Sequence, residues 1–227
     1  MADTEPVPAV VLGDDASGTR LIAVRHGETD WNRERRMQGQ TDSVLSELGW
    51  RQARALGRRL AGVPFAALYS SDLKRAYDTA RCVADLSGHQ IVTEPDLRER
   101  TFGIFEGLTW DEIKSRFPQE YQRFRSLDPD YVIPDGESAR AFFQRSIACL
   151  ERIARAHPGA TVVAVCHGLL LDSLYRAAHA MPLDARRSVD LFNASLNTFH
   201  YSASVWRMES WGDVEHLNEN ASVYVGD

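Results

Sequence analysis

The sequence predicts a three-layer α/β/α sandwich around a mostly parallel sheet with an antiparallel edge strand. Two short and nearly continuous apolar runs, Leu21–Val24 and Thr161–Val165, are typical of strands buried on both faces. Strand and helix patterns alternate along the chain, as they do where helical crossovers join parallel strands. A looser alternation between Phe199 and Met208 predicts one or two antiparallel strands at the sheet edge.

The remaining elements follow from capping signals and from the spacing of apolar residues. Five helices are expected, over residues 46–60, 72–86, 109–117, 138–156 and 169–179. Ser46 is the expected N-cap of the first helix, and Thr109 with Glu112 has the spacing of a capping box. The inner face of the fourth helix is expected to hold Phe143, Ile147, Leu150 and Ile153 or Ala154. Further short strands are expected over residues 67–70 and 91–93, with a turn at Gly212-Asp213.

Length and composition fit one domain. The chain has 227 residues, of which 44% are hydrophobic and 26% charged, as is ordinary for a globular protein. Residues 1–19 carry four acids and no base, and we expect them to form a flexible N-terminal tail. A single domain is expected over residues 20–227. Within it, the segment 107–136 ends in a polar stretch with Pro129 and Pro134, and we expect a lid that sets specificity.

The charge and the cysteines narrow the range of partners and compartments. A formal net charge of −6 argues against a nucleic acid or an anionic membrane as partner. No run approaches the roughly 18 apolar residues that a membrane-spanning helix requires. Three scattered cysteines make no disulfide framework and suit a reducing cytosol, so we expect a cytoplasmic protein. Monomer and homodimer both stay open, because the C-terminal strands offer a pairing edge.

Two predicted strands end in the same short pattern, in which a histidine is followed by a glycine. These are Val24-Arg25-His26-Gly27 and Val165-Cys166-His167-Gly168. Ligand sites in such sheets lie at the carboxyl ends of parallel strands, so we expect the two rings to meet there. The glycines are expected to provide the freedom in φ that a sharp turn needs. Arg75 begins a helix after a third strand, and its side chain is expected to point back over the same edge.

These residues resemble a known family. The run Arg25–Thr29, with Trp31-Asn32 behind it, resembles the signature of the histidine phosphatase superfamily, also called the phosphoglycerate mutase-like family. Further blocks resemble the family in order, at residues 45–49, 70–80, 97–107 and 165–168. The resemblance covers roughly residues 20 to 210. It implies an enzyme that takes a phosphoryl group onto a histidine and then passes it on.

The resemblance also implies a role for each matching position. His26 is the expected nucleophile, which becomes phosphohistidine, and Glu99 is the expected acid that protonates the leaving oxygen. His167 is the third expected catalytic residue and helps to hold the phosphoryl oxygens. The implied substrate-binding residues are Arg25, Asn32, Gln38, Arg75 and Gly168. Glu28 and Glu106 are competing carboxylates, for which we expect structural roles.

The implied residue types suit phosphoryl transfer, which needs positioning and positive charge around the transferred group. Arginine donates paired hydrogen bonds and stays charged at any relevant pH. A neutral imidazole is a good nucleophile, and Arg25, Arg75 and a protonated His167 would favour the neutral form of His26. The same cations stabilise the moving phosphoryl group, so no metal or other cofactor is expected.

A phosphomonoester hydrolase acting on small phosphorylated metabolites is the expected function. The family's mutases carry a longer insertion with paired arginines for the substrate carboxylate, whereas no Arg-Arg pair occurs between Glu99 and His167. The block at residues 102–107 also resembles the phosphatase branch. The alternatives are a phosphoglycerate mutase primed by 2,3-bisphosphoglycerate and, third, a non-catalytic phosphate-binding module. A thiol nucleophile is disfavoured, because Asp172 stands where a tyrosine-phosphatase loop starting at Cys166 needs arginine.

Overall fold

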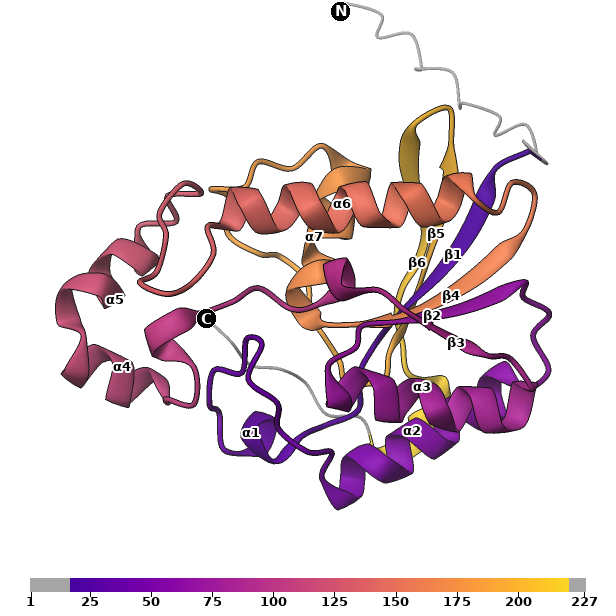
Figure 1. The fold of residues 1–227 in the computed structure, drawn as a ribbon, viewed down its shortest axis with the longest axis horizontal. Helices are drawn as coiled ribbons and strands as arrows, with labels where there is room; N and C mark the ends of the chain where they lie inside the picture. The colour runs from indigo at the N-terminus through magenta and orange to yellow at the C-terminus, as the bar shows by residue number, and fades with distance from the viewer. Residues whose placement is uncertain (1–16, 221–227) are drawn as a thin grey trace, which may run out of the picture.

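The computed structural model describes residues 17–220, which form one six-stranded sheet with helices on both faces (Figure 1). The strands are β1 (Thr19–Arg25), β2 (Ala67–Ser70), β3 (Ile91–Thr93), β4 (Thr161–Cys166), β5 (Leu196–Ser202) and β6 (Val205–Asp213). The α-helices are α1 (Asp30–Arg33), α2 (Glu47–Leu60), α3 (Lys74–Ser87), α4 (Trp110–Arg116), α5 (Pro118–Arg125), α6 (Ala139–Arg155) and α7 (Gly168–His179). Short 3-10 helices span Pro95–Leu97, Gly103–Phe105 and Glu215–Asn220.

The sheet has the strand order β3-β2-β4-β1-β5-β6. The first four strands of this order pair in parallel, whereas β5 pairs antiparallel with both β1 and β6. The C-terminal hairpin therefore supplies the antiparallel edge of a mostly parallel sheet. The predicted fold class is confirmed.

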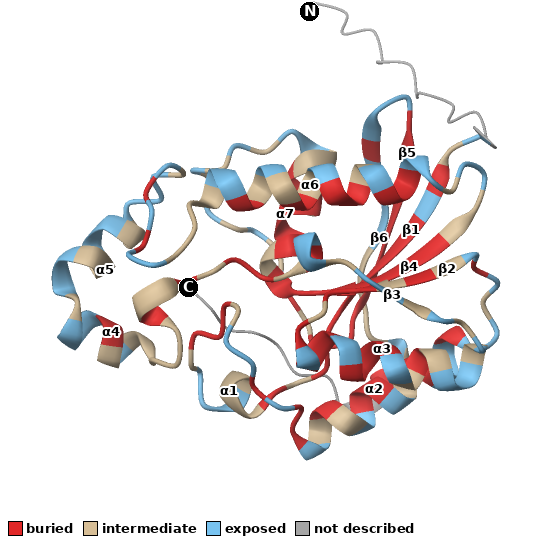
Figure 2. Ribbon diagram, in the orientation of Figure 1, coloured by how far each residue is buried: buried red, intermediate tan, exposed pale blue. Residues whose placement is uncertain are grey.

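Side chains of the central strands enter two apolar clusters, one on each face of the sheet. Leu21 and Ala23 pack with residues of α6 and α7, whereas Ile22 and Val24 pack with residues of α2 and α3. This period of two is the one expected for a strand that is covered on both faces. Figure 2 shows that the centre of the sheet is buried and that α2 and α3 each have one buried face.

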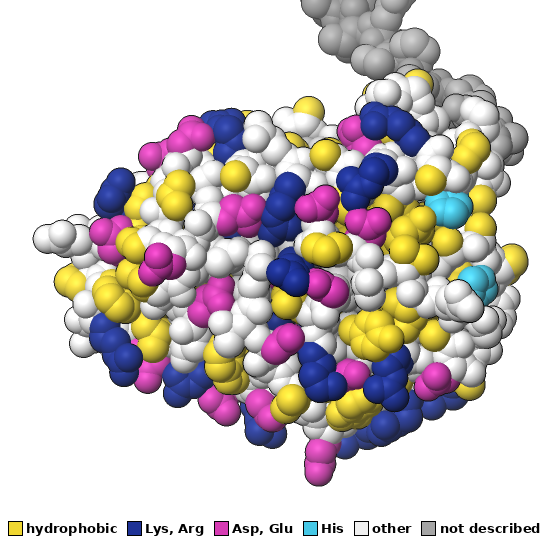
Figure 3. Space-filling model, in the orientation of Figure 1, with side chains coloured by type: hydrophobic (Ala, Val, Ile, Leu, Met, Phe, Trp, Pro, Cys, Tyr) yellow, Lys and Arg dark blue, Asp and Glu magenta, His cyan; other side chains and the backbone are white. Residues whose placement is uncertain are grey.

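The surface carries charges of both signs. Over most of the face drawn in Figure 3, Lys and Arg side chains are interspersed with Asp and Glu. Basic side chains gather along α2, where Arg51, Arg54 and Arg58 line one shallow hollow. Within residues 17–220, no helix has both the length and the apolar character needed to cross a membrane.

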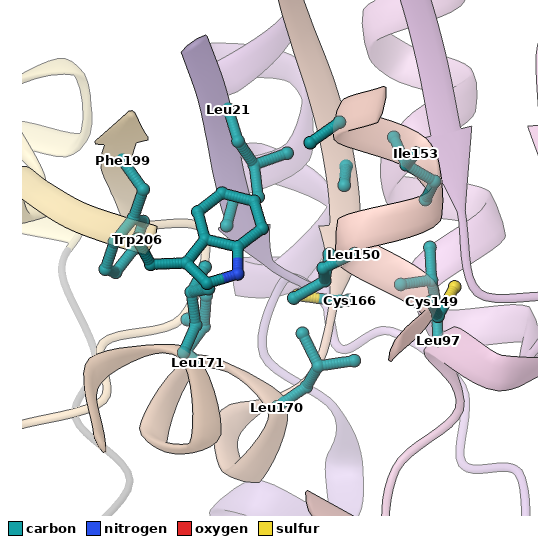
Figure 4. Packing of buried hydrophobic residues seen from close by; sticks show 14 of the residues in the cluster. Leu21, Leu97, Cys149, Leu150, Ile153, Cys166, Leu170, Leu171, Phe199 and Trp206 are labelled. Atoms are coloured by element: carbon teal, nitrogen blue, oxygen red, sulfur yellow. The ribbon is translucent and has the colours of Figure 1, made fainter. Parts of the chain in front are cut away.

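The apolar cluster under α6 and α7 joins the C-terminal hairpin to the rest of the sheet (Figure 4). Trp206 of β6 packs edge-on against Phe199 of β5, with ring centroids 6.5 Å apart. Leu21 of β1 and Leu171 of α7 belong to the same cluster. Burial of each such side chain stabilises the fold by about 1.5–3 kcal/mol, so the hairpin is an integral part of the core.

Pairing between β1 and β4 brings the two predicted histidines to one level of the sheet. Arg25 lies opposite Cys166, and the His26 amide donates to the Cys166 carbonyl over 3.0 Å. The amide of Ser71, directly after β2, also donates to β4 over 3.0 Å. His26, His167 and Ser71 therefore leave the sheet at the same carboxyl edge.

The C-terminal hairpin turns at Ala203-Ser204, so the turn predicted at Gly212-Asp213 is wrong. Both turn residues have positive φ, 49° and 60°, which glycine or asparagine usually supplies in a two-residue turn. Because neither glycine nor asparagine occupies this turn, its position could not be predicted from the residue types. Gly212, with φ of 67°, lies instead in a bulge of β6, where its amide donates to Asn197 Oδ1 over 2.8 Å.

Helix α6 buries a face that is rotated from the predicted one. Leu150 and Ile153 are buried as expected, but Phe143 and Ile147 are only half-buried. The buried face continues through Phe142, Ser146 and Cys149. Phe143 lines a cavity beside the first turn of α6.

The predicted boundary of the N-terminal tail also moves. Thr19, which was assigned to the tail, is the first residue of β1 and is buried. Its hydroxyl donates to the Ala154 carbonyl over 2.6 Å, a contact with α6 that composition alone does not reveal. Residues 1–16 of the predicted tail lie outside the described residues.

The loop after β1 lies directly on the first turn of α2. A Cβ atom on Gly27 would come within 2.6 Å of the Gly49 carbonyl oxygen, and one on Gly49 within 1.9 Å of the Glu28 carbonyl oxygen. Neither Gly27 nor Gly168 has a positive φ, so the turning role expected for these glycines is wrong. For Gly27, the glycine is required by the close approach of two backbones.

We predict that Gly49→Ala lowers the free energy of unfolding by about 1–3 kcal/mol, because the added methyl group forces two backbone segments apart. Urea denaturation followed by circular dichroism measures this change. Gly62→Ala is the matched control, since a Cβ atom there meets nothing within 4 Å. Equal stability of the two variants would contradict the close approach.

Candidate active site

A cavity of about 80 Å³ lies at the carboxyl edge of the sheet, and most of the predicted site residues line it. Those residues are Arg25, His26, Asn32, Gln38, Arg75, Glu99 and Gly168. His167 lies buried beside them, with its ring centroid 5.2 Å from that of His26. The structure therefore brings all eight predicted residues together from four separate stretches of the chain, at residues 25–38, 75, 99 and 167–168.

The His26 ring is held with one nitrogen turned toward its own backbone. Nδ1 lies 2.8 Å from the Gly27 carbonyl, which can only accept a hydrogen bond, so Nδ1 carries the proton. Burial, then the charges of Arg75 and Arg25, lower the pKa of His26 well below 6.5. The ring is therefore neutral at physiological pH, and its Nε2 carries the lone pair that a nucleophile needs.

Backbone carbonyls accept hydrogen bonds from both arginines. Arg75 is 1% exposed, and its Nη2 donates to the Gly39 carbonyl over 2.6 Å while Nη1 donates to the Thr41 carbonyl over 3.2 Å. Arg25 Nη1 donates to the Leu191 carbonyl. Burial lowers the pKa of Arg75 to about 10, so the side chain remains a cation at neutral pH.

His167 is neutral, so the protonated form expected from the sequence is wrong. Burial, then the charges of Arg75 and neighbouring groups, lower the pKa of its ring well below 6.5. Nε2 lies 2.8 Å from the Ser71 hydroxyl. When Ser71 donates to Nε2, Nδ1 carries the proton, and no described residue accepts it. His167 can therefore donate a hydrogen bond to an anion without adding a charge.

Glu99 is positioned by two backbone amides. Its carboxyl oxygens accept from the amide of Arg100 over 2.8 Å and from the amide of Leu169, in the first turn of α7, over 3.1 Å. Burial raises the pKa of Glu99, and these hydrogen bonds only partly oppose the effect. A carboxyl group with a raised pKa holds its proton more readily, as a general acid must.

Asn32 and Asn193 fix the backbone around His26. Asn32 closes a capping box with Thr29 at the start of α1, in which its Oδ1 accepts from the Thr29 amide over 3.1 Å. Asn193 Nδ2 donates to the His26 carbonyl over 3.0 Å and also approaches Asn32 Oδ1 at 3.4 Å. Sequence reasoning missed Asn193, because nothing local links the segment before β5 to the end of β1.

Glu106 holds the loop that positions Arg75. Its carboxylate accepts hydrogen bonds from the amides of Gln40 (3.1 Å), Thr41 (2.9 Å) and Phe102 (2.9 Å), and from the Thr41 hydroxyl. The carbonyls of this same loop accept from the Arg75 guanidinium. Glu28 is likewise structural, since its Oε1 accepts from Ser46 Oγ over 2.8 Å. These contacts agree with the structural roles expected for Glu28 and Glu106.

Helices α4 and α5 form a small apolar unit beside the cavity. Five aromatic side chains of this segment belong to one cluster: Trp110, Phe117, Tyr121, Phe124 and Tyr131. Trp110 and Phe124 also line the cavity, together with Phe102. Most of these aromatics therefore pack against one another, and two of them face the site.

Comparison with known proteins places the chain among phosphoryl-transfer enzymes. A model of the histidine phosphatase superfamily (branch 1) matches residues 21–214. The metal-independent phosphoserine phosphatase of Arabidopsis thaliana is 41% identical and covers 88% of this chain and 84% of its own. Phosphoglycerate mutase-like protein 4, from the same plant, is 37% identical and covers 94% and 93%. The solved structure of Bacillus stearothermophilus YhfR has a TM-score of 0.82 at 36% identity, and covers 88% of this chain and 99% of its own.

We predict that Glu106→Ala weakens the binding of inorganic phosphate by about tenfold, because the loop amides lose their acceptor and Arg75 loses its fixed orientation. Isothermal titration calorimetry measures the affinity. Glu106→Gln, which retains one acceptor oxygen, should recover part of the loss. Glu47→Ala removes an exposed acid from α2 and serves as control. Unchanged affinity in Glu106→Ala would show that the loop does not position Arg75.

Proposed function

The chain belongs to the histidine phosphatase superfamily, and on that premise we propose that it hydrolyses phosphate monoesters of small metabolites through a phosphohistidine at His26. One observation carries the proposal: a neutral imidazole lies beside two buried guanidinium groups, with a carboxyl group of raised pKa in the same cavity. The relative named as a metal-independent phosphoserine phosphatase supports hydrolysis without a metal.

The first half-reaction forms a covalent intermediate. Nε2 of His26 attacks the phosphorus atom while the bond from phosphorus to the ester oxygen breaks. Glu99 transfers its proton to that oxygen, so the alcohol leaves neutral and Glu99 becomes a carboxylate. Arg25 and Arg75 bind the phosphoryl oxygens, whose negative charge they compensate throughout the transfer.

The second half-reaction returns the enzyme to its starting state. The Glu99 carboxylate takes a proton from a water molecule, whose oxygen attacks the phosphorus atom. The bond between phosphorus and Nε2 then breaks, which releases inorganic phosphate and leaves His26 neutral. Asn32, Gln38, His167 and Gly168 complete the phosphate-binding pocket in this proposal. The guanidinium groups provide the positive charge, so the proposed reaction uses no metal.

Phosphoglycerate mutase activity is the second candidate, because another relative is named phosphoglycerate mutase-like. The phosphoryl group would then pass to a hydroxyl of a bound sugar acid, with 2,3-bisphosphoglycerate as primer. Incubation with 3-phosphoglycerate separates the two activities. Release of inorganic phosphate supports hydrolysis, whereas formation of 2-phosphoglycerate that depends on the primer supports the mutase.

The proposal also includes the compartment, the oligomeric state and the domain organisation of the enzyme. We place it in the cytoplasm, as a monomer or homodimer whose partner is a small phosphorylated metabolite rather than a nucleic acid or a membrane. The mixed charges of the surface support this view (Figure 3). We further propose that residues 107–136 act as the specificity lid of a single domain over residues 20–227, because part of the lid borders the cavity.

We predict that the wild-type protein hydrolyses p-nitrophenyl phosphate equally well with and without EDTA. His26→Ala should lower kcat by roughly three orders of magnitude or more, because the covalent route is lost. A colorimetric assay of released p-nitrophenol measures both effects. His179→Ala, which removes an exposed histidine, is the matched control. Wild-type turnover by His26→Ala, or loss of activity in EDTA, would rule out the proposed mechanism.

We predict that kcat/KM is highest on the acid side of neutrality. The reaction needs neutral His26 and protonated Glu99; the pKa of His26 is lowered below 6.5 and that of Glu99 is raised above 4.5. The rate should therefore fall as rising pH removes the proton of Glu99, and fall again where acid protonates His26.

The variant Glu99→Gln tests whether Glu99 supplies the proton to the leaving oxygen. Alkyl phosphates should lose about 100-fold or more in kcat/KM, because their leaving oxygen needs a proton. The first half-reaction with p-nitrophenyl phosphate should change much less, because p-nitrophenolate leaves readily without one. Equal losses of kcat/KM for both substrates would assign the proton transfer to another group.

A further inference from the structure

Glu99 lies on a segment of the chain that is neither strand nor helix. Residues 98–102 run between the 3-10 helices Pro95–Leu97 and Gly103–Phe105 without regular secondary structure. Backbone carbonyls in such a segment need hydrogen-bond donors from elsewhere. A catalytic group must also stay within about half an ångström of its working position. Side chains outside the segment must therefore hold it in place.

Arg145 of α6 provides most of these donors. Its guanidinium group has five N–H donors, and each of them has an acceptor. Nη1 donates to the carbonyls of Asp96 and Arg98 over 2.9 and 3.0 Å. Nη2 donates to the carbonyl of Glu99 itself over 3.0 Å. One planar group thus binds the backbone on which the proposed acid is carried.

Glu137 orients this guanidinium group. Its carboxylate oxygens accept from Nε and Nη2 of Arg145, at 2.8 and 3.0 Å, in a bidentate ion pair. The two side chains are only 23% and 18% exposed, so salt screens their attraction less than it screens a surface pair. The Glu137 amide also donates to the Thr101 carbonyl over 3.0 Å. Glu137 therefore holds both the arginine and the segment that the arginine binds.

The direction of the Glu99 carboxyl group depends on this backbone attachment. One carboxyl oxygen accepts from the Leu169 amide of α7, but the other accepts from the Arg100 amide, which belongs to the same irregular segment. The Glu99 carbonyl has one donor besides Arg145, the Gln40 side chain at 3.2 Å. If the segment shifts, the Arg100 amide shifts with it, and the carboxyl group loses its fixed direction.

We propose that Arg145, oriented by Glu137, is a positioning residue for proton transfer by Glu99. Within the described residues, Arg145 does not line the cavity at His26, so it acts through the backbone of residues 96–99. A reacting group that is misplaced by about 1 Å can lose about 100-fold in rate. The assignment rests on the proposed function, in which Glu99 is the acid.

The test uses two substrates whose leaving oxygens differ in their need for a proton. Phenyl phosphate and p-nitrophenyl phosphate differ in one nitro group, and phenolate is the stronger base, so it leaves less readily without a proton. Arg145→Ala should lower kcat/KM for phenyl phosphate by about 10-fold to 100-fold, and kcat/KM for p-nitrophenyl phosphate by at most about threefold. Weaker phosphate binding or a general loss of stability would lower both values equally.

Further variants connect the effect to the ion pair. Glu137→Gln keeps one acceptor oxygen and should show the same selective loss at a smaller size, and it serves if Arg145→Ala fails to fold. The double variant should lose no more than about twofold beyond Arg145→Ala, because Glu137 then has no guanidinium group to orient. Arg155→Ala is the matched control, since it removes an arginine of α6 that binds Glu151 and the Tyr201 hydroxyl instead. It should keep both wild-type values.

Two results would overturn the assignment while the proposed function stands. One is an equal loss of kcat/KM for both substrates in Arg145→Ala and in Glu137→Gln. The other is wild-type kcat/KM for phenyl phosphate in the folded forms of both variants. In either case, Glu99→Gln still shows the selective loss for phenyl phosphate. Equal losses in Glu99→Gln itself would instead overturn the role of Glu99 in the proposed function.

Discussion

The burial of two arginine cations beside His26 is the constraint on which the site depends. Backbone carbonyls, which carry only partial charge, accept hydrogen bonds from both Arg25 and Arg75, and these guanidinium groups border the cavity where an anion would bind. The same charge, together with burial, keeps His26 neutral and nucleophilic. Neutral His167 adds a hydrogen-bond donor without adding repulsion. One electrostatic arrangement thus serves both phosphate binding and activation of the nucleophile.

The fold sustains this arrangement by bringing distant segments to one sheet edge. Parallel pairing of β1 with β4 sets the two histidines at one level, and the first turn of α7 supplies an amide to Glu99. The loop around Gly39 fixes Arg75 and is itself fixed by Glu106. The segment before β5 returns to hold Arg25. The segment that leads into the C-terminal hairpin therefore supports the site.

Local signals in the sequence predicted the sheet, its helices and the residues that meet at its carboxyl edge. Buried strands can be recognised in the sequence as continuous apolar runs. Helix caps such as Ser46 and Thr109 can be recognised because they involve residues three positions apart. The Ala203-Ser204 turn was missed because its positive φ angles are imposed by the flanking strands. Glu106 was expected to be structural, but its particular contacts arise from residues far apart in sequence. Burial also leaves His167 neutral, whereas a positive charge was expected for it.

Trapping of the phosphoenzyme identifies the residue that receives the phosphoryl group. Wild-type and Glu99→Gln proteins are mixed with p-nitrophenyl phosphate, quenched in alkali within milliseconds, digested and mapped by mass spectrometry. We expect phosphate on the peptide that contains His26, with greater accumulation in Glu99→Gln, because that variant lacks the base for the second half-reaction. Phosphate on a different residue, or steady turnover with no phosphorylated peptide in either protein, would contradict the role assigned to His26.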